Sequence, residues 1–157
     1  MLFWYHILML EGDILEDVII NIKTVQYDSN SEEHDTIELR TEGKYYSDDG
    51  TDFLIYEESE LSGLLGTTTE IKIKGNHVEL NRIGEHESKM SFEKDKRYQS
   101  VMSTPMGNIP LEIMTNNISY DLHKDPLSLR LEFEYSIALK GLFQGKNTIS
   151  IEATHLK

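Results

Sequence analysis

The sequence predicts an all-β protein, a single antiparallel β-barrel of about eight to ten strands. Apolar and polar residues alternate along most of the chain, and residues that tolerate positive φ separate the alternating runs. No segment of comparable length shows the helical period of about 3.6 residues. Strands joined by such short turns pair antiparallel, and closing them into a barrel rather than stacking them as a sandwich removes unpaired edges.

The predicted strands follow one another at short intervals. In chain order they are residues 18–22, 37–45, 70–74, 78–80, 90–92, 109–113, 118–122, 127–139 and 149–151. The breaks between them include Asp48-Asp49-Gly50, Gly75-Asn76, Asn116-Asn117 and Lys124-Asp125-Pro126. Residues 57–66, EESELSGLLG, are the place for a short helical turn or an irregular crossing.

The clearest alternation is LSLRLEFEYSIAL at 127–139, with an apolar residue at every odd position. Such a run has one face buried and one face in water. The buried face can belong to a packed core or to the wall of a ligand cavity, because barrels of this size occur in both forms. The sequence leaves that choice open.

Charge and cysteine content narrow the function classes. Fifteen Lys and Arg against 28 Asp and Glu give a formal charge of −13, which repels phosphate backbones and anionic lipid head groups. We therefore expect neither nucleic acid nor a membrane as partner. The absence of cysteine removes disulfides, thiol nucleophiles and thiolate metal sites, and predicts a cytoplasmic location.

We divide the 157 residues into an N-terminal leader, 1–16, and one barrel domain, 17–157. The leader begins MLFWYHILML, which lacks the charged region and cleavage site of a signal peptide and is shorter than the about 20 apolar residues of a membrane span. Leu10-Glu11-Gly12 can be encoded with the ribosome-binding sequence GGAGG, followed by Leu15 as a TTG start. Residues 1–14 are then either untranslated leader or an ordinary docked strand or helix, and the nucleotide sequence decides between them.

Several segments resemble a known family. Arg82-x-Gly84, Met90-x-Phe92 and Thr104-x-x-Gly107 occur in this order after YEESELSGLLGTTTEIKI, which starts at Tyr56. Together with VELNRIG, KMSF and YQSVMSTPMGNIPLEIMTNNI they resemble the YwiB-like family of small bacterial proteins of unknown function. The resemblance covers most of the chain after about Asp17. It implies a calycin-like, lipocalin-type β-barrel and no activity, although the Gly-x-Trp signature of lipocalins is absent.

Arg82 is the first candidate for a functional side chain. It shares the parity of Val78 and Leu80, so without a bulge its guanidinium points into the barrel. A buried guanidinium requires a carboxylate partner or a ligand anion, and Glu57 and Glu60 are the candidate partners. Arg82 then either anchors a ligand carboxylate or phosphate at the barrel mouth or closes the barrel end by pairing with an acid.

Tyr45, Tyr120 and Tyr135 share the predicted inner face with Phe133. Their hydroxyls suit a cavity with polar tips, and they equally suit a packed core in which each hydroxyl reaches the rim or a carbonyl.

We predict no metal, no cofactor and no catalytic residue. Asp48, Asp49 and Asp52 around Gly50 resemble part of a calcium loop, but Ser59 stands at the twelfth position, where a bidentate glutamate is needed. The histidines show no metal-ligand spacing, and no nucleophile with a base is recognisable.

These observations favour a small-molecule-binding β-barrel over an enzyme. The ligand is partly apolar, with an anionic group as one option, and lies inside the barrel or at its mouth. The residues predicted to bind it are Arg82, Tyr45, Tyr120, Tyr135, Glu57 and Glu60. A protein-interaction module with a packed barrel and an enzyme that uses acids near Arg82 stay open as alternatives, as does the choice between monomer and homodimer.

Overall fold

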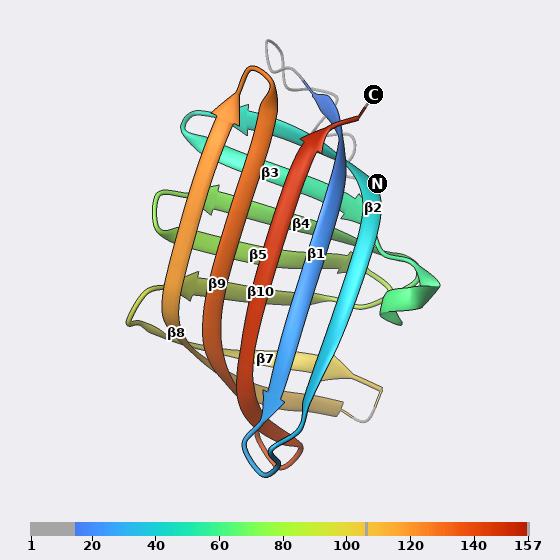
Figure 1. Cartoon of the computed structure of the whole chain (residues 1–157). Helices are drawn as coiled ribbons and strands as arrows, with labels where there is room; N and C mark the ends of the chain where they lie inside the picture. Colours follow the sequence, from blue (N-terminus) through green and yellow to red (C-terminus); the bar gives the residue numbers. More distant parts are fainter. Residues whose placement is uncertain (1–14, 106, 157) are drawn as a thin grey trace.

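The computed structural model describes residues 15–105 and 107–156, so the predicted leader 1–14 lies outside the described residues. Within them, ten strands form one antiparallel sheet in the order β6-β5-β4-β3-β2-β1-β10-β9-β8-β7 (Figure 1). The strands are β1 (Glu16–Asp28), β2 (His34–Asp48), β3 (Thr51–Glu57), β4 (Thr67–Lys74), β5 (His77–Gly84), β6 (Ser88–Glu93), β7 (Arg97–Thr104), β8 (Gly107–Lys124), β9 (Leu127–Leu139) and β10 (Phe143–His155). A 3₁₀ helix, η1 (Glu60–Ser62), lies in the predicted irregular segment. The predicted all-β fold and strand number are confirmed.

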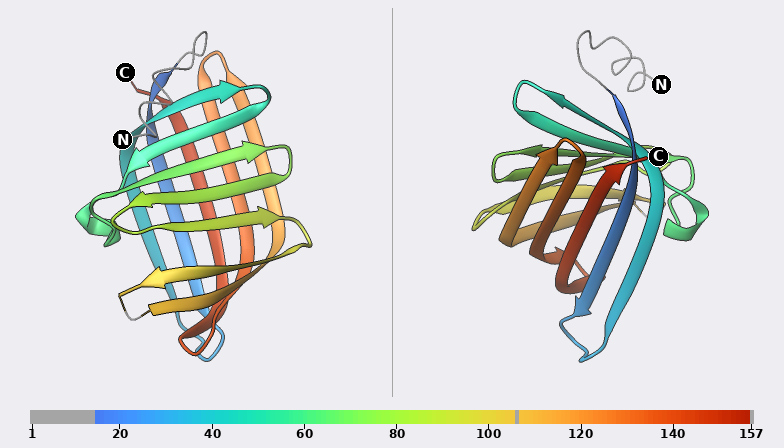
Figure 2. Two further views of the ribbon diagram at one scale, coloured as in Figure 1. Left: turned by 180° about the vertical axis from the view of Figure 1, so that it is seen from behind. Right: turned by 45° about the horizontal axis from the view of Figure 1, so that its top comes forward.

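The sheet curls into two layers that cross at a steep angle. The long strands β1, β9 and β10 run along one layer, and β3 to β6 cross behind them (Figures 1 and 2). Strand β2 belongs to both layers, because its residues up to Tyr45 pair with β1 and those from Lys44 onward pair with β3. Gly43 permits this passage: a Cβ there would lie 2.5 Å from the carbonyl oxygen of Ile55 and 2.6 Å from the side chain of Ile20.

The barrel is nearly closed. Strands β6 and β7 are the two edges of the sheet, and in the part of the chain that the structure describes no ladder joins them. A single parallel bridge between Lys94 and Thr115 links the β6–β7 turn to β8. The opening therefore lies between two strands that are consecutive in the sequence.

The interior of the barrel is filled. Among the described residues, the buried apolar residues are between 0 % and 8 % exposed and come from every strand except β7; those of β9 follow the predicted alternation, with Leu127, Leu129, Leu131, Phe133, Tyr135 and Ile137 all buried. An internal cavity that admits water would leave accessible surface on the side chains that line it. Rings also meet across the barrel, with the centroids of Phe92 and Phe133 4.7 Å apart. The apolar face of 127–139 covers a packed core.

One expectation about the strands was wrong, and two strands were not predicted. Asn116-Asn117 does not separate two strands: β8 is continuous over 18 residues and carries a register shift between Thr115 and Asn117. An extra residue of this kind bends a strand without ending it. Strands β3 and β7 carry apolar residues without clean alternation, so the two-residue period did not predict them.

No helix among the described residues is long and apolar enough to cross a membrane.

Candidate functional site

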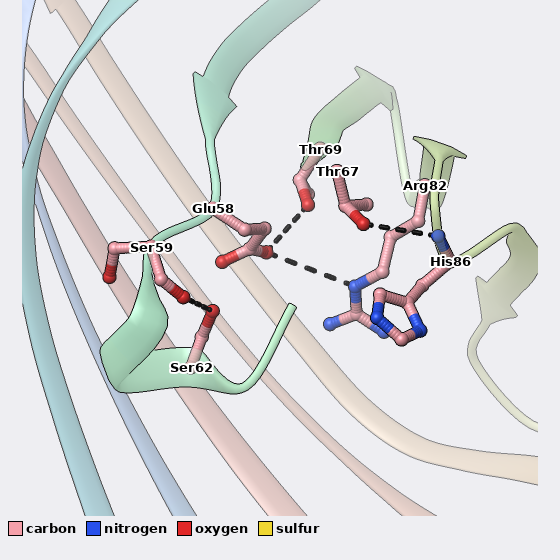
Figure 3. Close-up of polar contacts among 7 residues, drawn as sticks. All are labelled: Glu58, Ser59, Ser62, Thr67, Thr69, Arg82 and His86. Carbon is pink, nitrogen blue, oxygen red and sulfur yellow. Dashed lines mark hydrogen bonds and ion pairs between the residues drawn. The ribbon is translucent and has the colours of Figure 1, made fainter. Parts of the chain in front are cut away.

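Arg82 lies on the inner face of β5, as its parity with Val78 and Leu80 predicts. In the ladder it stands opposite Thr69 of β4 and Ser88 of β6. Its side chain is 24 % exposed, and Figure 3 shows it extending toward the segment that leads into η1. The guanidinium therefore sits at the end of the packed core, partly within reach of solvent.

The carboxylate that meets Arg82 is Glu58, not the predicted Glu57 or Glu60. Glu58 Oε2 lies 3.9 Å from Arg82 Nε and accepts a hydrogen bond of 2.6 Å from the Thr69 hydroxyl. Its side chain is only 2 % exposed. Glu57 and Glu60 are exposed, because Glu57 leaves β3 on the outer face and Glu60 begins η1 at the surface.

Within the described residues the Arg82 guanidinium is incompletely paired. Its Nε is buried and has no hydrogen bond, and the contact with Glu58 is longer than a hydrogen bond. The hydroxyl of Ser88, directly across the ladder, is also buried without a partner. Arginine carries several donors in a planar fork that matches carboxylate and phosphate. The exposed part of the Arg82 guanidinium therefore has donors to offer, whereas its Nε and the Ser88 hydroxyl are out of reach of a ligand.

A cavity of about 710 Å³ reaches these two residues from outside. Its walls at this end come from Ile83 beside Arg82 and from Ser100 and Val101 of β7 across the opening. Ile83 is 40 % exposed and Val101 57 %. The volume lies in the range of ligand pockets, about 300–1,000 Å³, but the cavity is a groove that is broadly open to solvent and extends along the outer face of the sheet past Asn81, Lys72 and Phe53.

Charges of both signs surround the cavity. Arg82, Lys72 and Lys89 line it together with two acids, Glu70 and Glu87. Two of these cations also face an acid, Arg82 at 3.9 Å from Glu58 and Lys89 at 3.3 Å from Glu79, so an anion would depend on Arg82 itself rather than on a local excess of positive charge.

The predicted tyrosines face inward but do not join Arg82. The hydroxyls of Tyr45 and Tyr120 both donate to the buried carboxylate of Asp52, at 2.7 Å and 2.9 Å. Tyr135 lies in the core, and its hydroxyl accepts a bond of 3.1 Å from Asn147. None of the three lines the cavity at Arg82.

Sequence reasoning did not assign Glu58, Ile83, Ser88 or Val101 to the site, and it considered Asp52 only as part of a calcium loop. Asp52 shares the parity of Leu54 and Tyr56 and was therefore assignable to the inner face, but Phe53 and Ile55 make the other face of β3 equally apolar.

Among the described residues, no three His, Asp or Glu side chains are placed to hold a metal ion.

Alkaline pH should destabilise the protein through its buried tyrosines. Burial raises the pKa of Tyr45, Tyr56, Tyr120 and Tyr135 above the ordinary value of 10.0. The unfolded chain releases these protons above about pH 10 while the folded chain keeps them, so stability present below that pH is lost as the pH rises toward the folded pKa.

Urea unfolding between about pH 9 and about pH 11.5 measures this loss. Tyr135→Phe should reduce the alkaline slope, by at most about 1.4 kcal/mol per pH unit, and Tyr27→Phe, at an exposed position, is the control. Equal slopes for both variants would contradict the expectation.

The fold and the site together define the class: a small, nearly closed antiparallel β-barrel with a filled core and an arginine at its opening. The chain belongs to the family DUF1934, described as a domain of unknown function, which matches residues 20–151. Its structure is similar to the crystal structure of the YwiB protein from Bacillus subtilis, with a TM-score of 0.79 and 20% identity over 91% of this chain and 94% of that one. The predicted resemblance to the YwiB-like family is confirmed, and the structural likeness establishes the fold alone. No curated protein matches the chain.

Proposed function

We propose that the protein binds a small, partly apolar anion at the opening between β6 and β7. The observation that carries the proposal is the Arg82 side chain, which is 24 % exposed and lines a 710 Å³ cavity while its contact with Glu58 is longer than a hydrogen bond. The exposed end of the Arg82 guanidinium would hold the carboxylate or phosphate, and Ile83 and Val101 would cover the apolar part. We place this activity in the cytoplasm and expect neither nucleic acid nor a membrane as partner.

The filled interior favours the mouth of the barrel over its centre as the ligand site. Glu58 supports the proposal because it holds Arg82 in place without satisfying it. A fully paired arginine would have little to gain from a ligand, since each new hydrogen bond would replace an existing one.

Hexanoate is the probe that tests this proposal, with hexanamide as its uncharged match. We expect hexanoate to raise the midpoint of thermal unfolding and hexanamide to have no effect, because a ligand that binds only the folded state stabilises it. Isotope-edited NMR titration should show the largest shifts at Arg82, Ser88 and Val101.

Two variants keep the test independent of folding. Arg82→Lys retains the charge beside Glu58 but loses the planar fork, and should weaken hexanoate binding about tenfold. Val101→Asp, at an exposed wall position, should weaken it by a similar factor through repulsion. Lys23→Gln, an exposed charge on β1, is the control. Equal binding of hexanoate and hexanamide would overturn the proposal.

A further inference from the structure

We infer that two copies of this chain associate through residues 34–43 of β2, which pair antiparallel with the same residues of the second copy about a two-fold axis at Leu39. We call residues 34–43 the β2 edge. This interface lies outside the proposed anion site, because Arg82 belongs to β5.

The first observation is that the β2 edge has a neighbouring strand on one side alone. Strand β1 pairs with β2 along residues 34–45, whereas β3 pairs only with residues 44–48. Figure 1 shows the β2 edge as the outermost strand of its layer, and residues 34–38 are exposed. Among the described residues, no turn or loop makes a backbone hydrogen bond to it.

This edge also lacks the residue that most directly prevents strand pairing. It contains no proline, which natural sheets place on edges because proline cannot donate to a ladder. A row of unpaired N–H and C=O groups on such an edge is a template for a further strand.

The second observation is a charge pattern that is complementary to itself. Glu38 and Arg40 stand on the outer face, one on each side of Leu39. When two identical strands pair antiparallel about a two-fold axis, residues at equal distances before and after the axis stand opposite each other. With the axis at Leu39, Glu38 of each copy therefore stands opposite Arg40 of the other, and such pairs stabilise a sheet.

Neighbouring registers lose this complementarity. An axis at Glu38 places that acid opposite its own copy. An axis at Arg40 places that cation opposite its own copy and Glu38 opposite Glu42. Because like charges directly opposite destabilise a sheet, the edge selects the register centred on Leu39. This match of the edge with itself favours a second copy over an unrelated strand.

The third observation is a pair of exposed apolar side chains that this register brings together. Ile37 is 54 % exposed and Leu65 is 58 % exposed. Leu65 lines the groove where β2 leaves β3, beside Thr41 and Gly43. In the register centred on Leu39, Ile37 of each copy stands opposite Thr41 of the other and therefore next to that copy's Leu65. Association can remove both side chains from water.

Sedimentation equilibrium of the full chain measures the dissociation constant of the dimer. Arg40→Glu replaces two opposite-charge pairs with two acidic pairs, and should raise this constant at least about tenfold. Combining Glu38→Arg with Arg40→Glu exchanges the charges and should return the constant to within about threefold of the original. Lys74→Glu makes the same change of charge at an exposed position of β4 and is the control.

A second variant and a second readout test the same interface. Leu65→Asp, at an exposed position, should also weaken the dimer about tenfold, and amide hydrogen exchange of residues 34–43 should slow as the dimer forms. A protein that stays monomeric up to about 1 mM overturns the inference. So does a dimer that Arg40→Glu does not weaken, that the exchanged charges do not restore, or that leaves exchange in residues 34–43 unchanged. Hexanoate binding at Arg82 is measured separately, so either proposal can fail while the other stands.

Discussion

Replacing Phe92 with alanine should lower the free energy of unfolding by about 3–5 kcal/mol. Phe92 is fully buried on β6 and lies between Phe133 and Tyr135, with ring centroids 4.7 Å from each. Truncation removes the transfer free energy of the ring and leaves a cavity that neighbours on two crossing layers cannot fill without moving backbone. Equilibrium denaturation in urea measures the loss.

The same experiment decides between a packed core and a cavity wall. A ring that lined a hollow interior would face solvent or ligand on one side, and its removal would cost much less. Val101→Ala, at an exposed position on β7, is the control and should change stability by no more than about 0.5 kcal/mol. A loss below about 1 kcal/mol for Phe92→Ala would contradict the filled barrel.

Replacing Arg82 with methionine should destabilise the protein by about 3 kcal/mol, near the lower end of the range for breaking a buried ion pair. The reason is Glu58, which is almost fully buried and would keep only the Thr69 hydroxyl as a partner. The partial exposure of Arg82 limits the loss, because solvent can approach the empty position.

A double-mutant cycle isolates the interaction. Combining Arg82→Met with Glu58→Gln should cost clearly less than the sum of the single changes, because the second substitution removes the buried charge that the first leaves unpaired. The exposed pair Arg97 and Glu112 on β7 and β8 is the matched control, with a coupling of about 0.2–1 kcal/mol. Strict additivity for Arg82 and Glu58 would mean that their contact carries no energy.

The sequence predicted the fold well because a strand with one buried face alternates apolar and polar residues, and this alternation can be read directly. Strand β9 shows this most clearly: every odd residue from Leu127 to Ile137 is buried. The prediction failed where this alternation is interrupted. The extra residue in β8 looks like a turn in sequence, and β3 is apolar on both faces, so neither feature has a period to detect.

The site was predicted in part. Parity alone placed Arg82 inside, but it could not select Glu58 from three nearby acids, since that choice depends on how the chain leaves β3. The tyrosines were assigned to the correct face of the sheet but were grouped with Arg82. Tyr45 and Tyr120 instead donate to Asp52, and Tyr135 accepts from Asn147. Tyr120 meets Asp52 across 68 positions of sequence, and such a contact depends on the register of the whole sheet.

The pairing of β1 with β10 bears on how the protein is made. Eleven residue pairs, from Val18 with His155 to Asp28 with Gly145, place the first strand of the chain beside the last. During synthesis β1 has no β10 to pair with until the end of the chain leaves the ribosome. The barrel is therefore completed only after β10 emerges. Long-range strand pairing of this kind makes folding slow, on the order of milliseconds to seconds, and leaves apolar surface available to chaperones in the interval.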